Sequence, residues 1–105
     1  MPLYVLHAKD KPDSLERRLE HYAAHRTFIE ASDAVDNVTV VMSGPLQTDD
    51  GTTMIGSLIL IEAPSREAVE QFVALDPFTR QGIWQEVLIS RFHRRHTVTQ
   101  PRPTN

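Results

Sequence analysis

Residues 2–8 are almost all apolar and are followed by a polar turn at residues 9–12, and this pattern predicts a β-strand near the start of the chain. Successive side chains of a strand point to opposite faces of its sheet. One face would carry Leu3, Val5 and His7, and the other face would carry Tyr4, Leu6 and Ala8.

The spacing of apolar residues then changes to three and four, which is typical of an amphipathic helix. Asp13 is the expected helix cap, and Glu16, three residues later, completes a capping box. The helix should run to about Ser32. One stripe along it carries Leu15, Arg18, Tyr22, His25 and Ile29.

Two more strands are predicted after a turn at residues 32–37. Residues 38–43 form the first of them, and Gly44-Pro45 should end it. Residues 54–62 form the second, and the polar residues 48–51 between the two could close a hairpin.

A second helix should begin at Ser65, whose hydroxyl is a good N-cap, and bury Val69, Phe72, Val73 and Asp76. Proline disfavours helical geometry in the residue before it, so the helix should stop ahead of Pro77. A fourth strand is predicted over residues 84–92.

The resulting order β-α-β-β-α-β is that of a ferredoxin-like α+β fold, a four-stranded antiparallel sheet with two helices on one face. Residues 1–93 would form this single domain, and the basic, proline-containing residues 94–105 a flexible C-terminal tail.

Two helices cover only one face of such a sheet, yet the third and fourth strands are apolar on both faces. In the fourth strand, Val87 and Ile89 lie opposite Trp84, Leu88 and Phe92. A large exposed apolar patch is unusual in a monomer. We therefore expect a second copy of the chain to cover the helix-free face, giving a homodimer.

Composition narrows the classes of function. The 105 residues carry a net charge of −3 and no cysteine. We expect no nucleic-acid partner, because there is no basic footprint, and no membrane partner, because no apolar run could span a bilayer. The lack of cysteine excludes thiolate chemistry and agrees with a cytoplasmic location.

His25 and Asp76 are the candidates for chemistry. A histidine titrates near neutral pH and can move protons in the cell, and a carboxylate beside it would fix its tautomer and raise its basicity. A structural interpretation stays open for each. His25 could be a buried histidine that makes structural hydrogen bonds, and Asp76 could cap a short helical turn that begins at Pro77.

Other polar residues could contact a small-molecule substrate near this pair. Arg18 and Tyr22 share the helix stripe with His25 and could hold an anionic oxygen, although the sequence alone favours a solvent-reaching Arg and a half-buried core Tyr. Ser43, Gly44 and Pro45 end a strand where backbone can approach a ligand. His7 could line a pocket or belong to a core or an interface.

No metal or other cofactor is expected. His93 and His96 have a helical metal-ligand spacing, but the arginines between and beside them repel a cation. The chain has four glycines and no phosphate-binding glycine-rich loop.

The sequence resembles the YciI-like family over residues 2–93. The matching segments are Tyr4–Lys11, Leu15–Leu19, Ala24-His25, Gly44-Pro45, Asp76-Pro77-Phe78 and Gly82-Ile83-Trp84. The resemblance implies a dimeric ferredoxin-like α/β barrel related to muconolactone isomerases, with an active-site pair at His25 and Asp76. Phe78 belongs to the same pattern and joins the residues expected to contact substrate.

One branch of this family resembles dehydrochlorinases that remove HCl from chlorinated hydroxyhydroquinones during aromatic degradation. The first hypothesis is thus a proton-transfer lyase or isomerase that acts without a cofactor on a small cyclic intermediate. The alternative is a small-metabolite-binding or accessory protein without catalysis. A cofactor-free oxygenase ranks lower, because nothing in the sequence marks an oxygen pocket.

Overall fold

The computed structural model describes residues 1–32 and 37–98, and the order of its elements confirms the β-α-β-β-α-β prediction. The elements are β1 (Leu3–Asp10), α1 (Leu15–Glu30), β2 (Thr39–Gln47), β3 (Met54–Glu62), α2 (Arg66–Leu75), α3 (Pro77–Arg80) and β4 (Trp84–Phe92). The predicted turn at residues 32–37 and the end of the predicted tail fall largely outside the described residues.

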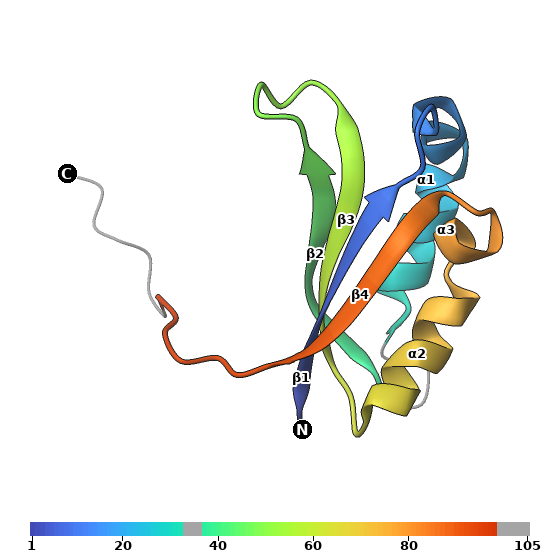
Figure 1. Ribbon diagram of the computed structural model, residues 1–105. Helices are drawn as coiled ribbons and strands as arrows, with labels where there is room; N and C mark the ends of the chain where they lie inside the picture. The colour runs from blue at the N-terminus through green and yellow to red at the C-terminus, as the bar shows by residue number, and fades with distance from the viewer. Residues whose placement is uncertain (33–36, 99–105) are drawn as a thin grey trace.

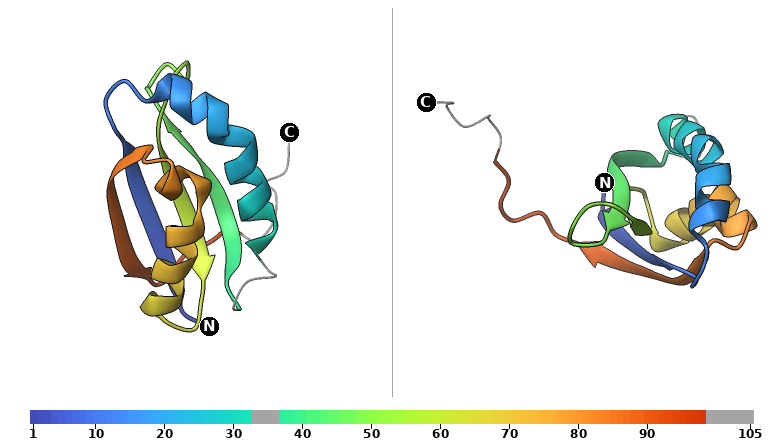
Figure 2. Two further views of the ribbon diagram at one scale, coloured as in Figure 1. Left: turned by 90° about the vertical axis from the view of Figure 1, so that its right-hand side faces the viewer. Right: turned by 90° about the horizontal axis from the view of Figure 1, so that it is seen from above.

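All neighbouring strands are antiparallel, in the order β2-β3-β1-β4, as the ferredoxin-like prediction requires. The helices lie together on one face of this sheet (Figure 1), and Figure 2 shows them side by side over the strands. None of the helices in the described part of the chain is long and apolar enough to cross a bilayer.

The core lies between the sheet and the helices. Leu6, Ile59 and Ile61 from the central strands are fully buried against Val69 and Phe72 of α2. The predicted apolar face of the second helix is therefore confirmed. Its predicted cap is confirmed too, because the Ser65 hydroxyl accepts a hydrogen bond from the Ala68 N–H at 3.2 Å.

The predicted capping box at the start of α1 is wrong. Asp13 has a positive φ of 59°, which places it in the turn that precedes the helix. Aspartate tolerates this left-handed geometry better than most residues. Ser14 becomes the N-cap, without a side-chain cap bond, and Glu16 lies in the first helical turn.

The predicted end of the second strand at Gly44-Pro45 is also wrong, because β2 continues to Gln47. Gly44 pairs with Leu58 and Pro45 pairs with Ser57. β2 is an edge strand, where a proline can occur without removing a ladder hydrogen bond. Ser43, Gly44 and Pro45 are consequently held in line along the sheet.

Trp84 faces the helices, and the prediction that it shares a face with Leu88 and Phe92 is wrong. The pairing register of β1 with β4 shifts between Lys9 and Asp10, so that Lys9 pairs with Glu86 and Asp10 with Trp84. This irregularity turns Trp84 inward, and only 7% of its surface is exposed.

The opposite face of the sheet has no helix over it, and we call it the open face. Strand pairing places on it Leu3, Val5, His7, Met42, Leu58, Leu60, Leu88 and Phe92. Met42, Leu88 and Phe92 are 62%, 54% and 42% exposed. The sequence-based expectation of an apolar helix-free face is therefore confirmed. After β4, residues 93–98 leave the sheet, are exposed, and lie in neither helix nor strand.

We predict that Gly56→Ala destabilises the fold, because a Cβ at this position in β3 would overlap the backbone carbonyl oxygen of Ala8. The loss should be about 1–3 kcal/mol, as for other overpacked cores. Urea unfolding followed by circular dichroism would measure it. Gly44→Ala is the matched control, because its Cβ would meet nothing within 4 Å; equal stability of the two variants would contradict the prediction.

Candidate active site

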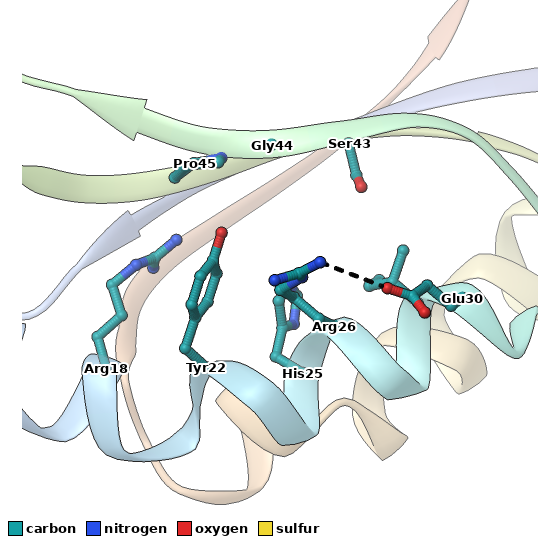
Figure 3. A pocket seen from close by; sticks show the side chains of 9 residues that line it. Arg18, Tyr22, His25, Arg26, Glu30, Ser43, Gly44 and Pro45 are labelled. Carbon is teal, nitrogen blue, oxygen red and sulfur yellow. Dashed lines mark ion pairs between the residues drawn. The ribbon is translucent and has the colours of Figure 1, made fainter. Parts of the chain in front are cut away.

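A cavity of about 160 Å³ lies between α1 and β2. Figure 3 shows the side chains of α1 rising toward the residues of β2. The lining residues are Arg18, Tyr22, His25, Arg26, Ile29 and Glu30 from α1 and Ser43, Gly44 and Pro45 from β2. The cavity thus joins one stripe of a helix with three consecutive residues of an edge strand.

His25 lines this cavity, and behind it His25 is paired with the buried Asp76. The His25 Nδ1 lies 2.8 Å from Asp76 Oδ1, and the two side chains are 9% and 1% exposed. An ionised carboxylate only accepts hydrogen bonds, so Nδ1 carries the proton. Among the described residues, Nε2 has no hydrogen-bond partner, which leaves its lone pair available to a ligand.

The local sequence explains why Asp76 is in place. α2 ends at Leu75, and Pro77 begins α3 as its first residue. Asp76 between them is extended, with φ −62° and ψ 132°, and its Oδ1 accepts the Phe78 N–H at 2.9 Å. A single oxygen therefore caps α3 and binds His25, so the expected cap and the expected contact between the carboxylate and the imidazole occur together.

Phe78 supports the pair and does not line the cavity, although the sequence resemblance suggested a substrate contact. It is fully buried, and its ring stacks on His25 with centroids 4.0 Å apart and planes 6° apart. The Trp84 ring and the same imidazole are arranged edge to face, with ring centroids 6.2 Å apart. The imidazole is thus held by a hydrogen bond at one atom and by aromatic rings around it.

Arg18 borders one end of the cavity but is 1% exposed, and its terminal nitrogens are occupied. Nη1 donates to both oxygens of Asp10 at 2.9 and 3.1 Å. Nη2 donates to the Gly56 carbonyl oxygen at 2.7 Å and to Ser57 Oγ at 2.9 Å. Its main contact is therefore with the sheet, which corrects the expectation that it reaches out to a substrate.

Burial also shifts the pKa values of Asp10 and Arg18. It raises the pKa of the Asp10 carboxyl, and the nearby positive charge of Arg18 offsets that shift only in part. The same desolvation lowers the pKa of Arg18, against the opposing effect of Asp10. Each group thus partly offsets the cost of burying the charge of the other.

Five of the residues expected to contact a substrate line the cavity: Arg18 at one end, together with Tyr22, Ser43, Gly44 and Pro45. Tyr22 points its hydroxyl toward β2, and Ser43 points its hydroxyl back toward α1 (Figure 3). Gly44 and Pro45 complete the β2 wall. These two hydroxyls, with His25 Nε2, are polar groups that converge on one small space.

His7 is not near this cavity, because strand pairing places it on the open face between Leu58 and Leu88. Its side chain is exposed there. The alternation along β1 already assigned it to the face opposite Tyr4 and Leu6, and the helices cover that other face.

Arg26 and Glu30 line the cavity and were missed by the sequence analysis. Tyr22, Arg26 and Glu30 follow one another at intervals of four residues, which places them on the same side of α1. This helical spacing is the feature of the sequence that could have identified Arg26 and Glu30.

Within residues 1–32 and 37–98, no group of three or more His, Asp or Glu side chains is placed to hold a metal ion.

Comparison with known sequences and structures gives related proteins over nearly the whole chain. A family model described as the YCII-related domain matches residues 2–93. Protein YciI of Escherichia coli is 30% identical over 97 residues, which cover 88% of this chain and 97% of the relative.

Two solved structures are informative. The 5-chloro-2-hydroxyhydroquinone dehydrochlorinase TftG of Burkholderia phenoliruptrix, in complex with 2,5-dihydroxybenzoquinone, is 33% identical with a TM-score of 0.75, over 87% of this chain and 93% of that chain. SnoaB, a cofactor-independent oxygenase of Streptomyces nogalater, is 11% identical with a TM-score of 0.53, over 94% of this chain and 97% of that chain. The second likeness shows the fold alone.

We predict that Asp10→Asn lowers the free energy of unfolding by about 3–5 kcal/mol, because the Arg18 charge would stay buried without a counter-charge. Chemical unfolding at neutral pH would measure the loss. Asp49→Asn, a change of the same type at an exposed residue of the β2–β3 connection, should fall within about 0.5 kcal/mol of the parent. An Asp10→Asn protein as stable as this control would show that the buried pair contributes nothing.

Proposed function

The chain belongs to the YCII-related domain family, and on that premise we propose that it is an enzyme that moves protons on a small cyclic substrate without a cofactor. The reaction that fits best is the removal of HCl from a chlorinated hydroxyhydroquinone. The observation that carries this proposal is the 2.8 Å bond between His25 Nδ1 and Asp76 Oδ1 at the wall of a cavity.

The mechanism begins with His25 as general base. Nδ1 is held by the carboxylate of Asp76, so Nε2 accepts the proton of a substrate hydroxyl, and Asp76 stabilises the imidazolium that forms. The oxygen lone pair then forms a ring carbonyl while the carbon that bears chlorine gains a proton, which His25 can return to it.

Loss of a second hydroxyl proton completes the reaction. The oxygen electrons form a second carbonyl, and chloride leaves with the electron pair of the carbon–chlorine bond. The products are a hydroxyquinone, one proton and one chloride ion. The departing chloride carries away the two electrons, so the step needs no external oxidant.

The dimensions of the site agree with a substrate of one ring. An engineered protein cavity of about 150 Å³ holds benzene, and the cavity here measures about 160 Å³. The hydroxyls of Tyr22 and Ser43 would donate hydrogen bonds to the oxygen that becomes negatively charged. Arg18 would contribute from one end of the cavity, where its terminal nitrogens are bound to Asp10, Gly56 and Ser57.

The TftG comparison supports the substrate class. That protein is a dehydrochlorinase bound to 2,5-dihydroxybenzoquinone, and it shares its fold and a third of its sequence with this chain. The alternative remains a protein that binds a small metabolite without turnover. The capping role of Asp76 Oδ1 favours that alternative to some degree, because it gives the pair a structural purpose.

We predict that Asp76→Asn removes most of the activity and little of the stability. Asparagine caps a helix as well as aspartate does, but it brings no negative charge to His25. The rate constant kcat for chloride release should fall about 10²–10⁴-fold, as it should in His25→Ala. The panel would contain chlorinated hydroxyhydroquinones, chlorinated hydroquinones and chlorinated catechols, with muconolactone followed by ultraviolet absorbance.

His96→Ala is the control, because this histidine is exposed beyond β4. Turnover that survives in His25→Ala would refute the general-base role. Saturable binding without turnover of any compound in the panel would favour the non-catalytic alternative.

We further propose that two copies of the chain pair through their open faces. Leu88, Met42 and Phe92 expose apolar surface there that one chain leaves uncovered, and burying it would release water from both copies. The cavity lies on the other side of the sheet, so pairing of this kind would leave its entrance accessible.

Leu88→Glu should convert the dimer to a monomer, because a carboxylate would be desolvated within the contact. Sedimentation equilibrium at micromolar concentration would measure the mass. Leu19→Glu is a matched control, since Leu19 on α1 is 55% exposed against 54% for Leu88. A parent protein that sediments as a monomer would overturn the proposal.

A further inference from the structure

Arg26 is the cation of the cavity lining whose terminal nitrogens are least engaged, among the residues that the structure describes. The terminal nitrogens of Arg18 donate hydrogen bonds to Asp10, Gly56 and Ser57. Arg26, by contrast, has one charged neighbour, Glu30, at 3.8 Å. The two side chains are 63% and 70% exposed, so water screens their attraction.

The position of Arg26 is set by α1. Tyr22, Arg26 and Glu30 follow one another at intervals of four residues, which aligns them on one side of the helix. The Arg26 guanidinium carbon lies 5.8 Å from the centre of the Tyr22 ring. Figure 3 shows the guanidinium in front of His25, below the Ser43 hydroxyl, with Glu30 beyond it.

A planar guanidinium binds two oxygens of a planar anion better than it binds one distant carboxylate. Glu30 is a weak counter-ion at 3.8 Å, and it can turn into water when a better anion arrives. The site therefore has a positive group beside the proposed base and an acidic group that competes for it.

We propose that Arg26 selects the ligands of the cavity by binding an anionic oxygen on a single ring, such as that of the hydroxyquinone product, and that Glu30 weakens this binding by competing for Arg26. The ligand class is a deprotonated hydroxyquinone or an equivalent phenolate of one ring. The inference rests on the proposed function, since it concerns the same cavity. It adds the requirement that the ligand carry a negative charge, which the His25–Asp76 pair alone does not impose.

Equilibrium binding tests this without turnover. The probe is 2,5-dihydroxybenzoquinone, which is ionised at neutral pH, and hydroquinone is the uncharged comparison of similar size. Titration calorimetry at low salt should show Arg26→Gln binding the quinone about tenfold more weakly, since one charge-assisted contact is lost. Its affinity for hydroquinone should not change. Glu30→Gln should bind the quinone more tightly than the parent.

Arg66→Gln is the matched control, because Arg66 and Glu70 form a second exposed pair of the same spacing on α2, at 3.5 Å. It should leave the affinity for the quinone unchanged. The inference is wrong if Arg26→Gln and the control bind the quinone equally well, or if the parent does not bind it. His25→Ala separates the two proposals: it should lose turnover and keep the dependence of quinone binding on Arg26.

Discussion

One carboxylate oxygen, Asp76 Oδ1, is the point on which the arrangement of the helices depends. It receives the Phe78 N–H at the start of α3 and the Nδ1–H of His25 from α1. A helix start leaves N–H groups that need acceptors, and a buried imidazole N–H needs one too. The proline that stops α2 therefore also fixes the acceptor that orients the imidazole. The fold and the candidate active site both use this atom. The site therefore depends on the same oxygen that arranges the helices.

Arg18 provides the second attachment of α1. Its guanidinium reaches Asp10 on β1 and the Gly56 and Ser57 groups on β3, while His25, two turns later, reaches the junction of α2 and α3. Burying a charge is costly, and four hydrogen bonds at 2.7–3.1 Å are the compensation for Arg18. The helix is thereby tied to the sheet at one point and to the neighbouring helices at another. Because these two attachments hold α1 in place, the space between α1 and β2 stays open.

The sequence predicts most of the fold, because period and capping are local properties. Short apolar runs bounded by polar turns identified β1 and β3, Ser65 identified the start of α2, and Pro77 identified its end. Asp13, Pro45 and Trp84 were misassigned, because left-handed geometry, an edge position and a shifted register depend on neighbours distant in the chain. His25 and Asp76 were found as separate candidates, but their shared oxygen was not. The sequence did not show the hydrogen bonds of Arg18 to Gly56 and Ser57, which lie 38 and 39 residues away, or the stacking of Phe78 on His25, which are 53 residues apart.

The two faces of β3 lead to different parts of the molecule. Ser57 and Ile59 face the helices and the support of the cavity, whereas Leu58 and Leu60 face outward on the open face. Neighbouring side chains on a strand do not touch one another, because they leave the backbone in opposite directions. Neighbouring residues of β3 can therefore change independently in evolution. One substitution alters the support of the cavity, and the next alters the surface that meets other molecules. A scaffold with this separation can acquire new substrates while keeping its assembly, and new assemblies while keeping its chemistry.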